Sequence, residues 1–119
     1  MSLALKLLGI EVGLNQTRIQ VQITPSGNYA TGGDTVDLTA LIGVAAGGVP
    51  VFAANNAPLY GVAQGSTGDD YDFIPGTQLN NGKLKINTAS NTELAAGAYP
   101  ARISGDAALF AEFVVAKNL

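Results

Sequence analysis

The sequence predicts an all-β protein: an antiparallel β-sandwich or jelly-roll-like single domain with about seven or eight short strands. Three observations support this prediction. Polar and apolar residues alternate in several short segments, turn-forming residues separate those segments, and no long amphipathic helix pattern occurs. Glycine and proline number 15 and 5 among 119 residues, which is more than globular proteins usually contain and favours many turns. The length is typical of one domain.

The N-terminal residues 1–12 are expected to form a strand or an extended arm, and residues 13–119 the β-sandwich. Leu3, Leu5 and Leu7 alternate with other residues, as they would in a strand. The beginning of this segment lacks a basic stretch and a small-residue cleavage site. We therefore expect it to be part of the structure and not a signal peptide.

The clearest alternation lies at residues 18–23, where Ile19, Val21 and Ile23 are expected to face the core. A turn is expected directly after this segment, at residues 25–28. The segment is therefore predicted to be a half-buried strand.

Two later segments also carry strong strand signals. A β-hairpin is expected at residues 77–86, because Asn81 and Gly82 both tolerate the positive φ of a type I′ turn. Residues 109–116 are nearly all apolar, which predicts a strand packed on both faces.

Four further segments carry weaker strand patterns, and turn-forming residues separate the strands. The weaker segments are 35–40, 58–64, 71–74 and 98–104. The stretch 36–46 is rich in leucine and alanine and also fits a helix, although we expect a strand followed by a loop there. Further turns are expected at residues 31–34, 46–48, 55–56 and 65–70.

The composition excludes several kinds of chemistry. Without cysteine the chain has no disulfide, thiolate nucleophile or cysteine-bound metal, and without histidine it lacks the commonest general base and metal ligand. The serines therefore have no histidine to activate them, and no phosphate-binding glycine motif is present. We expect no enzyme activity, no catalytic residues and no cofactor.

Charge and hydropathy argue against two further classes of partner. The formal net charge is -3, charged residues make up only 13% of the chain, and the basic residues do not cluster as in a nucleic-acid binder. No apolar run is long enough to span a membrane. We therefore expect neither nucleic acid nor a membrane as a partner.

The acidic cluster of the chain consists of Asp69, Asp70 and Asp72. Oxygen-rich clusters can hold Ca²⁺, which needs many oxygen ligands. Three carboxylates without a fixed ligand loop are more typical of a solvated turn that leads into a strand. We expect such a turn and no metal site, although the sequence alone leaves cation binding open.

Three segments of the chain carry a resemblance to a known family. They are residues 27–38 (GNYATGGDTVDL), 81–86 (NGKLKI) and 93–101 (ELAAGAYPA), the last followed by a strand with two phenylalanines. They resemble, in this order, an early element, a mid-chain hairpin and the closing segment of small bacteriophage decoration or cement proteins. The resemblance covers roughly residues 20–117. It rests on the order and the general composition of these segments and not on an invariant motif. One departure is Pro75, which should end pairing where related chains often continue an aromatic strand.

The resemblance implies a virion structural protein on the outer surface of an icosahedral phage head, made in the host bacterial cytoplasm. Such a protein binds the major capsid protein and cements adjacent subunits, which stabilises the shell. Homo-oligomerisation would engage several weak contacts at once. Closed symmetry would match the local axes of the shell, so we expect a homotrimer, with a homodimer as the alternative.

The N-terminal segment is the candidate surface for contact with the capsid or with another protomer. Its apolar residues are Leu3, Leu5, Leu7, Leu8 and Ile10. As an arm, the segment would exchange between protomers or add a strand to the edge of a capsid protein. The alternative is an ordinary first strand in the domain's own sheet.

Two other functions are left open by the sequence. A small carbohydrate- or ligand-binding β-sandwich would need an aromatic strand face, and Tyr71 and Phe73 come nearest to one. A phage tail subunit would assemble into open head-to-tail fibres instead of closed oligomers. The assembly state of the purified protein therefore distinguishes a tail subunit from a decoration protein.

Overall fold

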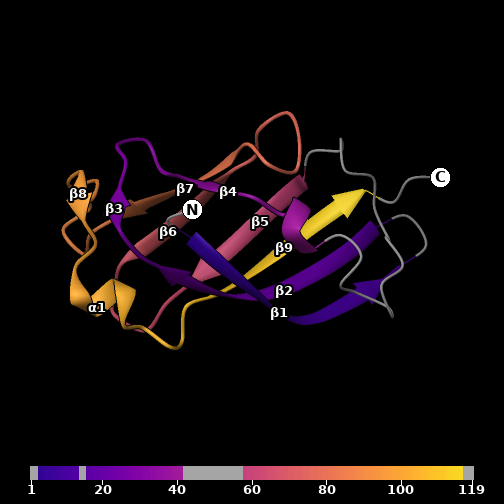
Figure 1. The fold of residues 1–119 in the computed structure, drawn as a ribbon, viewed down its shortest axis with the longest axis horizontal. Coiled ribbons are helices and arrows are strands. Elements are labelled where there is room, and N and C mark those ends of the chain that lie inside the picture. Colours follow the sequence, from indigo (N-terminus) through magenta and orange to yellow (C-terminus); the bar gives the residue numbers. More distant parts are fainter. Residues whose placement is uncertain (1–2, 14–15, 42–57, 117–119) are drawn as a thin grey trace.

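The structure is a computed structural model that describes residues 3–13, 16–41 and 58–116. These residues form short strands, a 3-10 helix and a one-turn α-helix (Figure 1). The elements are β1 (Leu3–Val12), β2 (Gln16–Pro25), β3 (Asn28–Tyr29), β4 (Asp34–Val36), η1 (Thr39–Leu41), β5 (Pro58–Gln64), β6 (Asp70–Ile74), β7 (Gly82–Asn87), β8 (Gly97–Ala98), α1 (Ala101–Ser104) and β9 (Phe110–Ala116).

Seven of the described strands form one antiparallel sheet in the order β1-β2-β9-β5-β6-β7-β4, while β3 and β8 form a two-stranded ribbon. The predicted all-β, antiparallel fold is therefore confirmed. The two outermost strands, β1 and β4, approach each other, so the sheet is curled around its core. Jelly-roll connectivity is not confirmed, because the seven strands belong to a single curled sheet.

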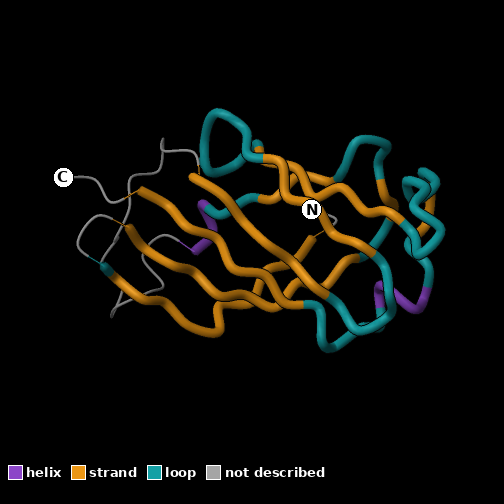
Figure 2. The backbone as a smooth tube through the Cα atoms, turned by 180° about the vertical axis from the view of Figure 1, so that it is seen from behind, coloured by secondary structure: helices purple, strands orange, loops and turns teal. Residues whose placement is uncertain are grey.

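The strands run along the length of the molecule, and loops join them at its ends (Figure 2). The β3–β8 ribbon and α1 lie together at one of these ends, on the left in Figure 1. The long strands β2, β9 and β5 cross the middle of the molecule side by side. These three strands are neighbours in the sheet and share one outward face.

The inward face of the sheet follows from the alternation in β2. Ile19, Val21 and Ile23 are completely buried, whereas the residues between them are more exposed. On the neighbouring strand β9, Phe113 lies opposite Ile19 and is also completely buried. The strand predicted at 18–23 and its core residues are confirmed.

The strand predicted at 109–116 is confirmed as β9, which lies inside the sheet between β2 and β5. Its inward residues are buried, and so is Val114 on the other face. Phe110 on that other face is 46% exposed, because its neighbours there, Gln22 and Gln64, leave the ring open to solvent. The predicted packing on both faces is therefore wrong at this end of the strand.

The core is closed by two aromatic rings that meet over a glycine of β5. The rings of Phe73 on β6 and Phe113 on β9 pack edge to face, with centroids 4.8 Å apart. A Cβ atom on Gly61 would lie 2.6 Å from the ring of Phe113 and 2.8 Å from that of Phe73. Only a residue without a side chain fits between these rings.

A network of tyrosines and carboxylates fastens the β3–β8 ribbon to the sheet. The Tyr29 hydroxyl donates to Oε2 of Glu93 at 2.8 Å and accepts the N–H of Ile86 at 3.1 Å. The Tyr99 hydroxyl donates to the carboxylate of Asp34, and the two tyrosine rings meet edge to face. Burial raises the pKa of Tyr29 to about 12, so its hydroxyl stays protonated at neutral pH.

The hairpin predicted at 77–86 is wrong. Oδ1 of Asn81 accepts the N–H groups of Thr77 and Gln78, both at 2.9 Å, and so closes a loop before β7. Gly82 does not have the positive φ that a type I′ turn requires. β7 pairs with β6 and β4 instead of with the residues that precede it.

The strands predicted at 58–64 and 71–74 are confirmed as β5 and β6. The strand predicted at 35–40 is right only in its first part. β4 ends before Asp37, whose Oδ1 accepts the N–H of Thr39 at 2.9 Å and turns the chain into η1.

The strand predicted at 98–104 is wrong over most of its length. Pro100 has no N–H to contribute to a strand ladder. Its carbonyl oxygen accepts the N–H groups of Ile103 and Ser104, both at 3.0 Å, which begins α1. Ile103 is completely buried, so this helix contributes to the core.

The predicted turns connect strands wherever the structure describes them. The turn at 25–28 connects β2 to β3, and the turn at 31–34 connects β3 to β4. The turn at 65–70 connects β5 to β6. The turns expected at 46–48 and 55–56, and the alternative helix beyond residue 41, lie outside the described residues.

The N-terminal segment forms β1, an edge strand that pairs antiparallel with β2 of the same sheet. A register shift between Leu7 and Gly9 marks a β-bulge. The candidate contact residues differ in their environment: Leu3 is buried, Leu5, Leu7 and Ile10 pack partly against the core, and Leu8 is 51% exposed.

Gly61→Ala is expected to destabilise the fold by about 1–3 kcal/mol, because the added methyl group overlaps both phenylalanine rings. Urea denaturation measures the change in the free energy of unfolding. Gly9→Ala in β1 is the matched control, since its Cβ would meet only the flexible side chain of Gln20, at 3.1 Å. The control should change the free energy by less than about 0.5 kcal/mol. Equal losses in both variants would contradict the packing argument.

Candidate functional site

The outward face of β2, β9 and β5 carries rows of side chains from neighbouring strands. Residues directly opposite each other in antiparallel strands point to the same face of a sheet. The rows are Gln22–Phe110–Gln64, Gln20–Glu112–Val62 and Arg18–Val114–Tyr60. Apolar and amide side chains therefore dominate this face.

Several large apolar side chains on this face are open to solvent. The exposed fractions of Phe110, Tyr60 and Val62 are 46%, 50% and 60%. Leu8, in the bulge of β1, is also half-exposed. We call Leu8, Tyr60, Val62 and Phe110 the outer apolar surface. Exposed apolar residues that gather on one face are typical of an interaction site.

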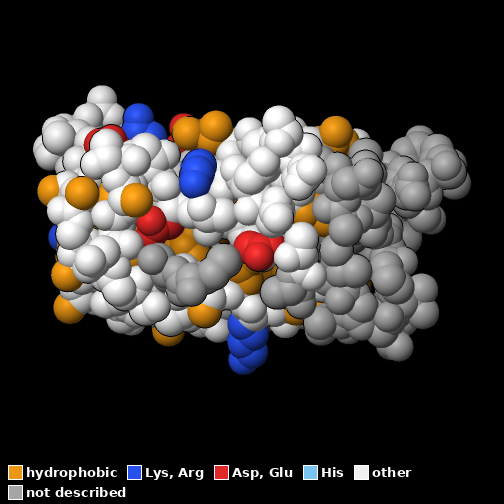
Figure 3. Space-filling model, turned by 45° about the horizontal axis from the view of Figure 1, so that its top comes forward, with side chains coloured by type: hydrophobic (Ala, Val, Ile, Leu, Met, Phe, Trp, Pro, Cys, Tyr) orange, Lys and Arg blue, Asp and Glu red, His pale blue; other side chains and the backbone are white. Residues whose placement is uncertain are grey.

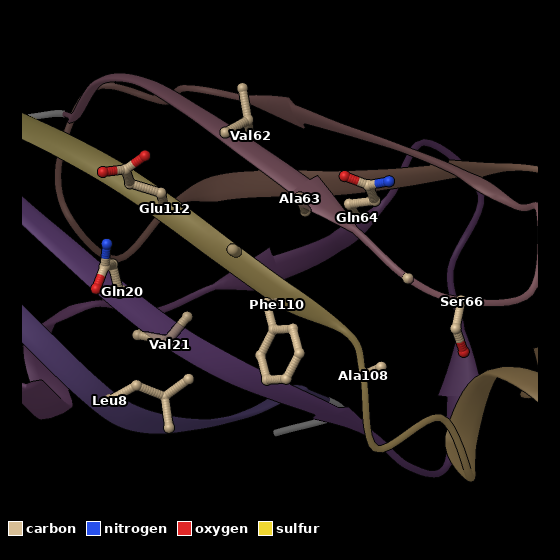
Figure 4. Close-up of a pocket in the computed structure, with 12 residues that line it drawn as sticks. Leu8, Gln20, Val21, Val62, Ala63, Gln64, Ser66, Ala108, Phe110 and Glu112 are labelled. Atoms are coloured by element: carbon tan, nitrogen blue, oxygen red, sulfur yellow. The ribbon is translucent and has the colours of Figure 1, made fainter.

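An open groove of about 730 Å³ runs over part of this face (Figure 4). The ring of Phe110 stands in the groove, with Leu8 of β1 on one side and Val62 of β5 on the other. Gln20 and Glu112 line the same groove from β2 and β9. Side chains from four strands of the sheet thus surround one aromatic ring.

Three polar side chains of the groove are available to a ligand. Gln20, Gln64 and Glu112 make no side-chain hydrogen bond with the other residues that the structure describes. Glu112 is the only titratable residue among the described residues that line the groove. A single carboxylate without a second acid or base can accept hydrogen bonds, but it does not make an acid–base pair for catalysis.

Charged side chains are sparse on the surface. Figure 3 shows, on the face that it presents, isolated acidic and basic side chains among uncharged groups. Within the described ranges one ion pair is formed, between Arg102 and Asp69. The described surface therefore offers little concentrated charge for long-range electrostatic attraction.

Asp69 has a structural role in the turn that precedes β6. Its side chain is only 2% exposed, and its Oδ1 accepts a hydrogen bond from Nη2 of Arg102 at 2.9 Å. Oδ2 accepts from the hydroxyl of Thr67 at 2.6 Å. The hydrogen bond from Arg102 holds the pKa of Asp69 below its usual value. The predicted solvated turn is wrong for this residue, because Arg102 from α1 covers it.

The other two aspartates of the acidic cluster point away from Asp69. Asp70 and Asp72 lie on β6 opposite Asn87 and Lys85 of β7, and both are exposed. The three carboxylates therefore do not converge. In the described part of the chain, no group of three or more His, Cys, Asp or Glu residues could hold a metal ion.

Of the five candidate contact residues, only Leu8 reaches the outer apolar surface. Phe110, Tyr60 and Val62 were not predicted from the sequence as contact residues. The signal for Phe110 was its position, because it is three residues from the buried Phe113 and so lies on the opposite strand face. Tyr71, proposed for an aromatic face, packs against the core instead.

The chain was compared with protein families, curated proteins and solved structures, and none of them matched. In the described ranges no helix is long and apolar enough to cross a membrane. Function is therefore inferred from the exposed surface and its chemistry.

The ion pair of Asp69 predicts a specific pH dependence of stability. Because the pKa of Asp69 is lowered in the folded state, its contribution is present above the unfolded pKa of about 4 and is lost as the pH falls through the lowered value. In Asp69→Asn this part of the acid dependence should be absent. Thermal unfolding between neutral pH and the acid range measures it, and identical pH profiles would contradict the assignment. Arg102→Gln removes the main cause of the lowered pKa of Asp69 and should lose the same part of the acid dependence.

Proposed function

We propose that this protein is a virion structural protein that binds the outer surface of an icosahedral phage head and cements adjacent major capsid protein subunits. The observation that supports this most is the outer apolar surface, where Phe110, Tyr60 and Val62 stay about half-exposed or more on a folded domain. Burial of such side chains by a partner removes apolar area from water, which drives association.

The chemistry of the chain supports an adhesive role. A cementing protein needs a stable fold and a complementary surface, and it does not need reacting groups. The carboxylates of Asp34, Asp69 and Glu93 already accept hydrogen bonds from neighbouring residues. The sparse charge argues for a protein lattice as the partner and against nucleic acid. Homo-oligomers would engage several lattice contacts at once.

Purified protein mixed with undecorated shells is expected to bind up to a fixed copy number per shell. Replacing Phe110 and Val62 together by serine should weaken binding by about tenfold or more, because it removes apolar area from the contact. Cosedimentation with shells, with the bound copies counted, measures both quantities.

Ala98→Ser is the control, because Ala98 is also exposed but lies on β8, in the two-stranded ribbon and not on the outward face of β2, β9 and β5. This variant should bind like the wild type, and circular dichroism should show that all variants are folded. Absence of uptake by the wild type, or unchanged uptake of the Phe110/Val62 variant, would refute the proposal. Open fibres of the free protein would indicate a tail subunit instead.

A second candidate function is binding of a saccharide or a similar small ligand in the groove. The half-exposed ring of Phe110 stands beside Gln20, Gln64 and Glu112, whose polar groups have no partner among the described residues. Aromatic rings pack on the apolar faces of ring-shaped ligands, while amides and carboxylates hydrogen-bond to hydroxyl groups.

If the groove is a saccharide site, an oligosaccharide retained on a glycan array should bind Gln64→Ala about tenfold more weakly, because one hydrogen-bonding group is lost. Titration calorimetry measures the affinity. The same variant should keep shell binding, since the amide contributes no apolar area. Failure of the wild type to retain any glycan would exclude this second function.

A further inference from the structure

β1 is an edge strand that, within the described residues, is hydrogen-bonded as a strand to β2 alone. The short strand β4 approaches β1, but the described residues of the two strands do not pair. β1 extends from Leu3 to Val12, whereas the other edge strand, β4, extends only from Asp34 to Val36. A long edge presents N–H and C=O groups with which a further strand can pair. β1 is therefore the place where this sheet can be extended.

The bulge of β1 brings two opposite charges to the same face. In a regular strand residues 6 and 11 would point to opposite faces, because successive side chains alternate. Here Lys6 lies opposite Gln22, and Glu11 lies opposite Arg18, both of which alternate with the buried residues of β2. The extra residue of the bulge thus places Lys6 and Glu11 together on the outward face, and both are exposed.

We infer that a second copy of this chain pairs with β1 edge to edge, antiparallel, about a two-fold axis between Leu8 and Gly9. In this register Lys6 lies opposite the partner's Glu11, and Glu11 opposite the partner's Lys6. Neither residue forms an ion pair with the other residues that the structure describes. Opposite charges that face each other across two strands stabilise the pairing.

The apolar residues match in the same register. Leu7 lies opposite the partner's Ile10, and both are inward residues that pack only partly against their own core. The half-exposed Leu8 lies opposite the partner's Gly9, which has no side chain and leaves room for it. The pairing therefore covers apolar area that β1 leaves open in a single copy.

The bulge makes this edge selective. Moving the register by one residue would place the outward Lys6 opposite the partner's inward Ile10. Sheet geometry does not allow this, because directly opposite residues point to the same face. An ordinary strand does not match a bulged edge. A second β1 carries the same bulge at the mirrored position, so β1 is protected from other strands and fits itself.

This inference deepens the proposed function, because it selects two-fold over three-fold symmetry for the homo-oligomer. Pairing through β1 is a property of the purified chain and is measured without shells. Loss of pairing and loss of shell binding are therefore separate results, and either one can fail alone.

Analytical ultracentrifugation of the purified full chain is expected to show a dimer at about 100 μM. Lys6→Glu and Glu11→Lys should each weaken the dimer by about tenfold or more, because each places like charges opposite each other at both ends of the pairing. Mixed in equal amounts, the two variants should form a heterodimer, since every lysine at these positions then faces a glutamate.

Lys83→Glu is the matched control, because it changes the net charge equally at an exposed residue of β7. It should leave the dimer unchanged, and circular dichroism should show that all variants are folded. A wild-type monomer, a wild-type trimer or mixed variants that do not associate would overturn the inference.

Discussion

The contact of Phe73 and Phe113 over Gly61 is the constraint on which the rest of this structure depends. The two rings occupy the space that a side chain at position 61 would need, and they hold β6, β5 and β9 around one core. The contact also decides which residues face outward. Because side chains alternate along a strand, burial of Phe113 on the inward face obliges Phe110 to point to the outward face of the sheet. The outer apolar surface is thus a geometric consequence of the core and of the apolar composition of β9 and β5.

Several titratable groups in the described part of the chain serve its architecture. Asp34 and Glu93 accept hydrogen bonds from buried tyrosines, and Asp69 accepts from Arg102. Carboxylates engaged in this way hold loops and the end ribbon in place, because a buried polar group left unpaired is costly. The groups that remain free on the outward face are amides, apolar side chains and single charges. Such groups can contact other molecules, as the proposed adhesive role requires.

Strands with one solvated face were predictable from sequence, because their alternation directly records burial, as at residues 18–23. The loop closed by Asn81 was not predictable. Its sequence suits a hairpin equally well, and the outcome depends on the ring of Phe73, which packs against Gly82 from a different strand. The ion pair of Asp69 was also not predictable, because its partner Arg102 is distant in the sequence. In the candidate site, Leu8 was predicted as a contact residue because it lies in an apolar segment. Phe110 could not be predicted as one, because that requires knowing which face of β9 is buried.

The bulge of β1 shows how one extra residue can separate specificity from affinity. A cross-strand pair of opposite charges contributes only about 0.2–1 kcal/mol, so Lys6 and Glu11 cannot hold two copies together alone. Main-chain hydrogen bonds and the apolar residues of the strand must supply most of the binding free energy. The charges instead fix the register, because a shift by one or two residues leaves them opposite apolar residues or glycine. In the proposed cementing role a modest affinity would be sufficient, since a shell would hold neighbouring copies at a high effective concentration.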